Sequence, residues 1–490
     1  MEAMQLLITA GLAVLAVLAV YRRRRSRHAL HTAQTMPTIL VADADAARRL
    51  IIGHADSFSN HPAVLLPVDI DAGHPRTQSI TIAPYGPLWR ALRGNLTANI
   101  VHPSRLSHLA TIQRRAVEAL VADLSAAGRG AAGEEEVVVR DGVYAAVFTT
   151  VVRLCFGDDD GVGGYDARAI QSALREFFHS GVDATLLGRS RLARLVHWRQ
   201  WRYLVGTRHR LAELFGPVIA ARRRSRRSNG EDTGGISSYL DSLLDLRIPN
   251  NDDADLAGTR RELRDDEVVR LVWEFLGSST EAVVACVEWT LARLVTEPEV
   301  QKKLHHELVT ASDHRKGRVS EDRLQDIPYL RAVILESLRL HPPLPLIVRE
   351  VRPEGVAAAG ATPPPDGTPV RFLFNAEEIA RDQKVWTDPD EFRPERFLAG
   401  GEGEDVSPVP GPNKGIKMMP FGAGRRHCPG VGLSMIHVGC FVALLVREFD
   451  WAPPADGSGV DLTAINTLVV KMMASPLRAR ITPRTRMSQP

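Results

Sequence analysis

Apolar side chains recur at the three-to-four-residue spacing of amphipathic helices over most of the chain after residue 100. Strands and turns are expected over 351–374, where Gly, Pro and Val are frequent, and a short strand over 37–41. Polar, Gly-rich surface loops are expected at 225–235, 250–258 and 399–413. The fold class is therefore mainly α with a minor β region, with helices predicted at 44–54, 106–126, 137–156, 167–180, 192–223, 236–246, 265–296, 299–310, 322–340 and 430–448.

The first 27 residues have a different pattern. Residues 4–20 are almost wholly apolar, and an arginine-rich block follows at 22–27. An apolar run of this length is at the short end of the range that spans a bilayer, and the arginines should stay on the cytosolic side. A cleaved signal peptide carries its charges before the apolar run. We therefore predict a single-pass membrane anchor at 1–27 and a cytosolic catalytic domain at 28–490.

Composition narrows the class of protein further. The chain has 490 residues, 44% of them hydrophobic, and a formal net charge of only +3. A chain of that size can bury a large core, and its weak overall charge does not favour nucleic-acid binding. The four cysteines are too few and too scattered for a disulfide framework, so a reducing compartment is expected for the catalytic domain.

The strongest chemical signal lies at 421–430, which reads Phe-Gly-Ala-Gly-Arg-Arg-His-Cys-Pro-Gly. Gly422 and Gly424 allow tight turns and a close approach to a flat cofactor. Cys428 and Pro429 lie at the start of an apolar helix, where the helix dipole favours a thiolate and backbone N–H groups can donate to its sulfur. Arg426 is placed to meet an anionic group of the cofactor.

This segment resembles the haem-binding signature Phe-x-x-Gly-x-Arg-x-Cys-x-Gly of the cytochrome P-450 superfamily. The resemblance implies that the cofactor is heme b, with the sulfur of Cys428 as its ligand to iron. It also implies that the haem is surrounded by the other fixed positions of the signature, namely Phe421, Gly422, Gly424, Arg426 and Gly430.

Two further segments resemble the superfamily in sequence, and they occur in the same order along the chain. Glu336 and Arg339 are three residues apart on one helix face and can pair. With the Pro-Glu-Arg-Phe segment at 394–397, they resemble a buried network of the superfamily that braces the cysteine loop. The resemblance implies a structural role for Glu336, Arg339 and Arg396, and such a network is costly to break.

Upstream, the segment at 85–93 resembles the Trp-x-x-x-Arg helix of the superfamily. Trp89 and Arg93 are four residues apart, so both can face one haem propionate. Arg349 resembles a further propionate-facing arginine of plant members. The resemblance covers about 55–483 and is greatest to plant microsomal members, in particular the eighty-ninth and seventy-seventh families. The segments that carry this likeness are His-Pro-Ser-Arg at 102–105, Leu-Cys-Phe-Gly-Asp at 154–158 and Lys-Met-Met-Pro at 417–420.

The long helix at 265–296 departs from the superfamily pattern. Members usually carry an acid followed by threonine, whereas Glu281 is followed here by Ala282. That threonine helps to deliver protons for oxygen activation. Either Thr280 or Ser279 supplies a displaced hydroxyl, or water beside Glu281 carries the protons, or the protein is not a monooxygenase. A second departure is the short stretch 27–37, which leaves little room for the usual proline-rich hinge.

The resemblance implies a monooxygenase that inserts one oxygen atom of dioxygen into an apolar small-molecule substrate. The sequence has no flavin or nicotinamide fingerprint, so NADPH would act only indirectly, through an NADPH-cytochrome reductase. Membrane lipid is the other expected partner, and the expected location is the endoplasmic reticulum membrane. Glu281 and Thr280 are the predicted catalytic residues. The alternatives are a reductase-independent haem-thiolate isomerase or lyase, and a haem-binding pseudoenzyme.

Overall fold

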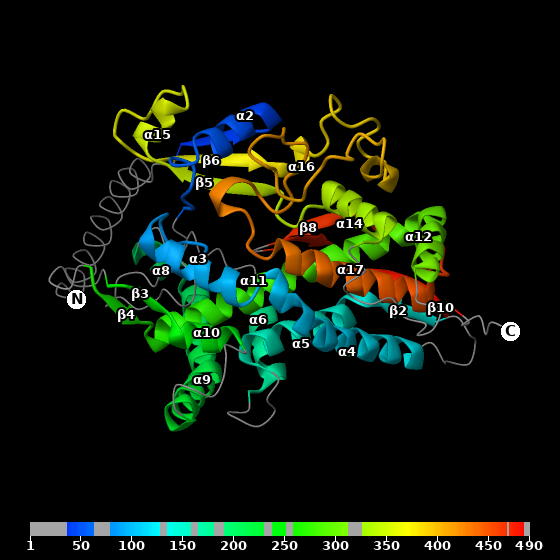
Figure 1. The fold of residues 1–490 in the computed structure, drawn as a ribbon, viewed down its shortest axis with the longest axis horizontal. Helices are drawn as coiled ribbons and strands as arrows, with labels where there is room; N and C mark the ends of the chain where they lie inside the picture. Colours follow the sequence, from blue (N-terminus) through cyan, green and yellow to red (C-terminus); the bar gives the residue numbers. More distant parts are fainter. Residues whose placement is uncertain are drawn as a thin grey trace, which may run out of the picture.

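The structure, a computed structural model, describes residues 37–62, 79–127, 135–157, 165–180, 191–229, 238–250, 258–311, 326–467 and 470–484. The predicted anchor at 1–27 lies outside these residues. Most of the described chain is helical (Figure 1). The helices are α2 (Ala44–Arg48), α3 (Pro87–Asn99), α4 (Pro103–Ala127), α5 (Val139–Phe156), α6 (Ala167–Phe178), α8 (Arg191–Val196), α9 (Trp198–Asn229), α10 (Tyr239–Asp245), α11 (Asp265–Thr296), α12 (Pro298–Thr310), α14 (Pro328–Leu340), α15 (Pro353–Ala358), α16 (Ala376–Ile379) and α17 (Val431–Glu448). Single turns of other helix types are η1 (Arg49–Gly53), η4 (Pro394–Phe397) and η5 (Gly424–Arg426).

Small sheets form the minor β part. The largest two have three strands each: β1 (Thr38–Val41), β6 (Val370–Asn375) and β5 (Leu346–Val351) in one, and β2 (Glu135–Val138), β10 (Arg478–Pro483) and β7 (Phe449–Ala452) in the other. In the first, β1 pairs parallel and β5 antiparallel to β6, and this sheet lies with α2 and α15 at the top of Figure 1. Two hairpin-like pairs join β3 (Arg247–Pro249) to β4 (Arg260–Glu262) and β8 (Ala464–Asn466) to β9 (Lys471–Met473).

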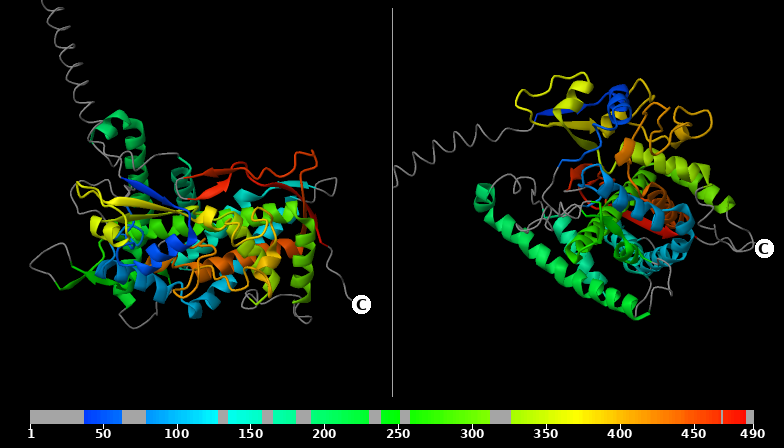
Figure 2. Two further views of the ribbon diagram at one scale, coloured as in Figure 1. Left: turned by 90° about the horizontal axis from the view of Figure 1, so that it is seen from above. Right: turned by 60° about the vertical axis from the view of Figure 1, so that its left-hand side comes forward.

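Helix α11 runs through the middle of the helical part and organises the core. Its first turn carries three acidic residues, which favour the positive end of the helix dipole, and Pro298 starts the next helix just after it ends. Three quarters of its length is buried among α5, α9, α14 and α17, while α9 lies along the outside of the helical part (Figure 2). A helix that is apolar nearly all round belongs in a core.

Helix α17 begins three residues after Cys428 and is buried in the same core. Within the described ranges it is the one helix long and apolar enough to cross a membrane by length and composition. Its buried side chains pack against α4, α11, α12 and α14, which accounts for its apolar character. The apolar helix after the cysteine is therefore a core helix, and it fixes the cysteine loop to the rest of the protein.

The mainly helical fold with a minor β part is confirmed, and several predicted boundaries are corrected. The helix expected at 137–156 starts at 139, because Glu135–Val138 pairs with β10 instead. The helix expected at 192–223 is divided near His197, and its second part extends to Asn229, into the segment expected as a loop. The mixed segment at 351–374 also contains a short helix, α15, which was not predicted.

Candidate functional site

The cysteine loop is a closed turn that lies between the β1-β6-β5 sheet and α17 (Figure 1). Gly422 and Gly424 have φ angles of +74° and +67°, which side-chain-bearing residues rarely adopt. A Cβ on Gly424 would also lie 2.7 Å from the carbonyl oxygen of Ile51. The N–H of Cys428 donates to the carbonyl of Phe421 at 2.8 Å and closes the loop. The two glycines predicted for tight turns therefore make them, and they bring Cys428 to the start of α17.

Burial raises the pKa of the Cys428 thiol, whereas the N–H of Gly430 and the guanidinium of Arg93 lower it. Gly430 is the residue that caps α17, so its N–H reaches the sulfur from the positive end of that helix. The loop thus supplies both a donor and a nearby cation for a thiolate. A bound iron ion would offset the remaining cost of deprotonating Cys428, because metal ligation and loss of the thiol proton are coupled.

Three arginines gather beside this loop. Arg93 comes from α3, Arg349 from β5, and Arg426 from the loop itself. Burial and the charge of Arg426 lower the pKa of Arg349 to about 9, and burial and the charge of Arg93 lower that of Arg426 to about 10. The ring of Trp89 lies beneath two of these cations, 5.8 Å from the Arg93 guanidinium and 4.8 Å from that of Arg426.

Within the described residues no carboxylate forms an ion pair with any of these arginines, and the Nε atom of Arg349 has no hydrogen-bond partner. A buried charge without a partner is costly. Arg426 donates to the backbone carbonyls of Ser59, Ile80, Thr81 and Ala83 and lies in the field of the Glu274 carboxylate. In the described part of the chain the open donors of the cluster are therefore the Arg93 side chain and Nε of Arg349, and their chemistry fits the propionates of a haem. The residues of the cluster, Trp89, Arg93, Arg349 and Arg426, are those that the sequence pointed to.

Two groups in this cluster were not predicted. His61 accepts from Arg349 Nη1 at 2.6 Å and its Nδ1 lies 2.7 Å from the carbonyl of Thr81, so it bridges β5 to the segment before α3. Burial and Arg349 lower the pKa of His61 to about 3, and the ring is neutral. Glu274 on α11 accepts from the N–H groups of Ile80 and Thr81 at 3.0 and 2.7 Å. No local pattern marks these contacts, since they join segments far apart in the sequence.

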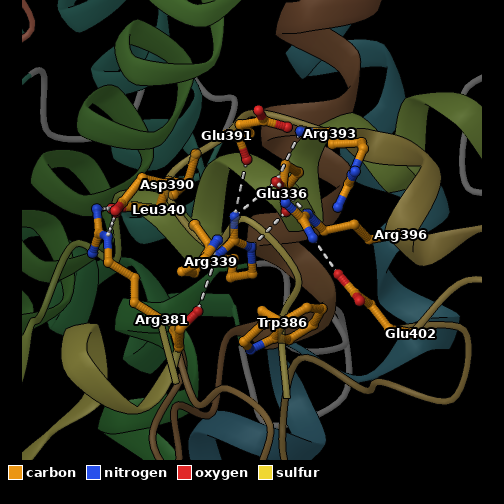
Figure 3. A network of polar contacts seen from close by, with 12 residues as sticks. Glu336, Arg339, Leu340, Arg381, Trp386, Asp390, Glu391, Arg393, Arg396 and Glu402 are labelled. Atoms are coloured by element: carbon orange, nitrogen blue, oxygen red, sulfur yellow. Dashed lines mark hydrogen bonds and ion pairs between the residues drawn. The ribbon is translucent and has the colours of Figure 1, made fainter. Parts of the chain in front are cut away.

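The predicted bracing network is present in full (Figure 3). Glu336 accepts from Arg339 at 2.7 and 2.8 Å and from Arg396 at 3.2 Å, and all three side chains are almost completely buried. Arg339 also donates to backbone carbonyls of Ala380, Pro389 and Glu391. Glu402, which the sequence did not single out, pairs with Arg396. The network therefore ties α14 to the chain that leads into the cysteine loop.

The middle of α11 has two different sides. Ser278 is exposed, Ser279 and Ala282 are partly exposed, and Cys286 lies one turn after Ala282. Burial and the charge of Cys428 raise the pKa of the Cys286 thiol, which indicates that this side of α11 is directed to the cysteine loop. The position that carries threonine in most members of the superfamily thus faces the cysteine loop. In this chain it is Ala282, which has no hydroxyl.

Glu281 and Thr280 project from α11 in directions about 100° and about 200° away from that of Ala282. The hydroxyl of Thr280 is buried and donates to the carbonyl of Leu276 at 2.7 Å. The carboxylate of Glu281 accepts from the Tyr144 hydroxyl at 2.9 Å and lies 3.7 Å from Nε2 of His179. Burial raises the pKa of Glu281 to about 7. The structure therefore does not bring Thr280 to the side that carries Ala282, and it places Glu281 beside Tyr144 of α5 and His179, the residue after α6.

A cysteine at the start of a buried helix, beside three arginines that form no ion pair within the described residues, is the arrangement that a haem bound through a thiolate requires. The model of the cytochrome P450 family matches residues 16–473. The chain therefore belongs to the cytochrome P450 family, whose members bind haem and are in general oxygen-incorporating oxidoreductases.

Relatives agree with this assignment. The chain is 32% identical to cytochrome P450 89A9 of Arabidopsis thaliana, over 91% of this chain and 84% of the relative. It is 30% identical to cytochrome P450 78A1 of Zea mays, over 91% and 78% of the two chains. The predicted likeness to plant members, including the eighty-ninth family, is confirmed. A solved structure of a zebra fish cytochrome P450 with progesterone superposes with a TM-score of 0.69 at 21% identity, over 92% of this chain and 95% of that one, which supports the fold.

Proposed function

We propose that this chain is a monooxygenase that inserts one atom of dioxygen into an apolar small-molecule substrate, with electrons from an NADPH-dependent reductase. The observation that carries the proposal is Cys428 at the start of α17 beside the cations of Arg93, Arg349 and Arg426, none of which forms an ion pair within the described residues. Bound haem supplies the oxygen activation, and a thiolate ligand raises the electron density at iron and favours O–O cleavage. The protein's own residues then hold the haem and move protons.

Each residue has a task in this proposal. Cys428 ligates the iron, and the N–H of Gly430 donates to its sulfur. Arg93, Arg349 and Arg426 would face the propionates, whose negative charges would balance those of the arginines. Glu281 holds and releases protons near pH 7, as its burial allows. A role for Thr280 requires that its bond to the Leu276 carbonyl open first.

The location and domain division are part of the same proposal. Residues 1–27 anchor the chain to the endoplasmic reticulum membrane, and 28–490 form the catalytic domain on its cytosolic side. The support is the apolar run followed by arginines. A membrane location also suits an apolar substrate, which partitions into lipid.

A second function is favoured by one observation on α11. Ala282 faces the cysteine loop without a hydroxyl, and Thr280 points elsewhere. A haem-thiolate isomerase or lyase that rearranges a hydroperoxide needs neither a reductase nor protons delivered to dioxygen. A haem-binding pseudoenzyme is the third reading of the same substitution.

The test begins with the carbon monoxide difference spectrum of the reduced protein in membranes. The strongly red-shifted band of thiolate-ligated haem is expected for the wild type and for Cys440→Ser, and its loss is expected for Cys428→Ser. Turnover of fatty acids, terpenoids or phenolics with NADPH and a reductase then supports the monooxygenase. Turnover of a hydroperoxide without a reductase supports the isomerase or lyase, and neither activity with an intact band supports the pseudoenzyme.

A further inference from the structure

Tyr144, Glu281 and His179 form a chain of polar groups from the core to the surface, beside the part of α11 that carries Ala282. Glu281 is 1% exposed, Tyr144 is 2% exposed, and the His179 side chain is 34% exposed at the end of α6. The Tyr144 hydroxyl donates a hydrogen bond to Oε1 of Glu281. The other oxygen, Oε2, has no hydrogen-bond partner within the described residues and is directed to Nε2 of His179, 3.7 Å away.

We propose that His179 is the entry point through which solvent protons reach Glu281, and that Tyr144 is a positioning residue that holds the carboxylate toward it. The proposal rests on the proposed function, because it assigns the source of the protons that a monooxygenase consumes. In the transfer, a solvent proton binds the free ring nitrogen of His179, the Nε2–H bond breaks, and an Oε2–H bond forms on Glu281. No electrons are exchanged. A small side-chain rotation or one bridging water closes the 3.7 Å gap.

The charges around the pair favour inward transfer. Burial, with the cations of Arg175 and Arg140, lowers the pKa of His179. Burial raises the pKa of Glu281 to about 7, although the Tyr144 hydrogen bond and the same two cations oppose this. Glu281 therefore holds a proton more tightly than His179 does, and a proton that arrives at the ring moves on to the carboxylate.

The remaining charged groups near the pair are engaged elsewhere. Arg140 donates to Glu288 at 2.9 Å, and Arg175 pairs with Asp141 while its guanidinium lies 5.3 Å from the centre of the Tyr144 ring. His179 is thus the half-exposed titratable group placed against the open oxygen of Glu281. Ala282 brings no hydroxyl to the haem side of α11. A route that delivers solvent protons to Glu281 compensates for that missing proton donor.

The first experiment reads the proton on Glu281 without turnover. Infrared difference spectra of the haem-loaded protein are recorded against pH, and the protonated-carboxyl band that Glu281→Gln abolishes is followed. In the wild type this band should disappear with a midpoint near 7. In Tyr144→Phe the midpoint should rise by about one pH unit, because a hydrogen bond to the ionised form is lost. An unchanged midpoint in Tyr144→Phe overturns its positioning role.

The second experiment separates proton entry from a structural role of His179. In His179→Gln the infrared midpoint should remain within about half a pH unit of the wild type, because the lost ring is neutral at that pH. Product formed per NADPH should fall at least about threefold, a modest part of what a positioned proton donor contributes, with hydrogen peroxide formed instead. His305→Gln, a partly buried histidine on α12, is the control and should change neither quantity.

Three outcomes overturn the proposal: unchanged coupling in His179→Gln, a fall that His305→Gln reproduces, or a fall that comes with a shifted infrared midpoint. The last would show that His179 acts on structure and not on proton transfer. A wild type that consumes no NADPH with a reductase would instead contradict the proposed function. The infrared result for Tyr144→Phe does not depend on NADPH turnover. Failure of this proposal can therefore be distinguished from failure of the proposed function.

Discussion

Glu336 and Arg339 face each other one turn apart on α14, with Oε2 and Nε separated by 2.7 Å and neither side chain exposed to solvent. Arg396 shares the same carboxylate, so one buried anion serves two cations (Figure 3). A buried ion pair adds little net stability over an apolar pair, but the loss of one partner leaves an uncompensated charge. The network therefore specifies how α14 meets the segment before the cysteine loop, and it does so through a single residue, Glu336.

We expect Glu336→Gln to lower the free energy of unfolding by about 3 to 5 kcal/mol, because it leaves the buried Arg339 guanidinium with no carboxylate opposite it and leaves Arg396 with Glu402 alone. The haem content of the purified protein should fall with it. Denaturant unfolding and the ratio of haem to protein absorbance measure the two effects. Glu299→Gln removes a carboxylate from an exposed pair with Lys302 and should leave both quantities unchanged. Equal effects of the two substitutions would contradict a bracing role.

Substitution of an arginine in the predicted propionate site should stabilise the haem-free protein and weaken haem binding. The Arg93 side chain makes no hydrogen bond within the described residues and lies beside Arg426, so the repulsion between the two cations destabilises the folded protein when no anion is bound. Arg93→Met should therefore stabilise the haem-free protein. It should weaken haem binding by about tenfold, the size of one lost charge-assisted hydrogen bond.

Thermal unfolding of the haem-free protein and the rate of haem transfer to an acceptor protein measure these effects. Arg90→Met is the matched control, since Arg90 lies on the same helix with its guanidinium over Tyr85 and is exposed. Weaker haem binding together with a less stable haem-free protein would show that Arg93 is structural.

The part of the fold that the sequence determined best is α11, whose observed ends agree with the prediction at both residues. An acidic first turn and a following proline are local signals that fix a helix without reference to the rest of the chain. The cysteine loop was predictable for a similar reason. Its glycines, its arginine and its cysteine lie within eight residues, so their spacing alone indicates the turn.

The contacts that were missed depend on residues distant in sequence. His61 meets Arg349 across 288 positions, and Tyr144 meets Glu281 across 137. No periodicity relates such partners, because they meet only when α5 and β5 have packed. The same reason explains the start of α5, where a partner strand, β10, takes residues that a local pattern assigns to the helix.

Position 282 gives a third prediction. Ala282 lies on the side of α11 directed to the cysteine loop, and it has room because it is partly exposed. Ala282→Thr should raise product formed per NADPH by about twofold or more, because it places a hydroxyl where protons are consumed. Val283→Thr adds a hydroxyl of similar size one residue later, on a buried part of the helix, and should not. The ratio of product to hydrogen peroxide checks both, and no gain in Ala282→Thr would remove the hydroxyl argument.

The buried carboxyl of Glu281 gives a pH dependence whose sign can be worked out. Its pKa in the folded protein, about 7, lies above its ordinary value of 4.5. Between these values the folded state binds more protons than the unfolded state, so this group's contribution to stability falls as the pH rises from about 4.5 to about 7. Glu281→Gln, which mimics the protonated acid, should unfold with the same free energy as the wild type near the lower value. Above the higher one it should be more stable by a few kcal/mol, at about 1.4 kcal/mol per pKa unit. Denaturant unfolding of both proteins at a series of pH values tests this, with Glu299→Gln as an exposed control; a gain that does not depend on pH would mean that Glu281 is not the group that titrates.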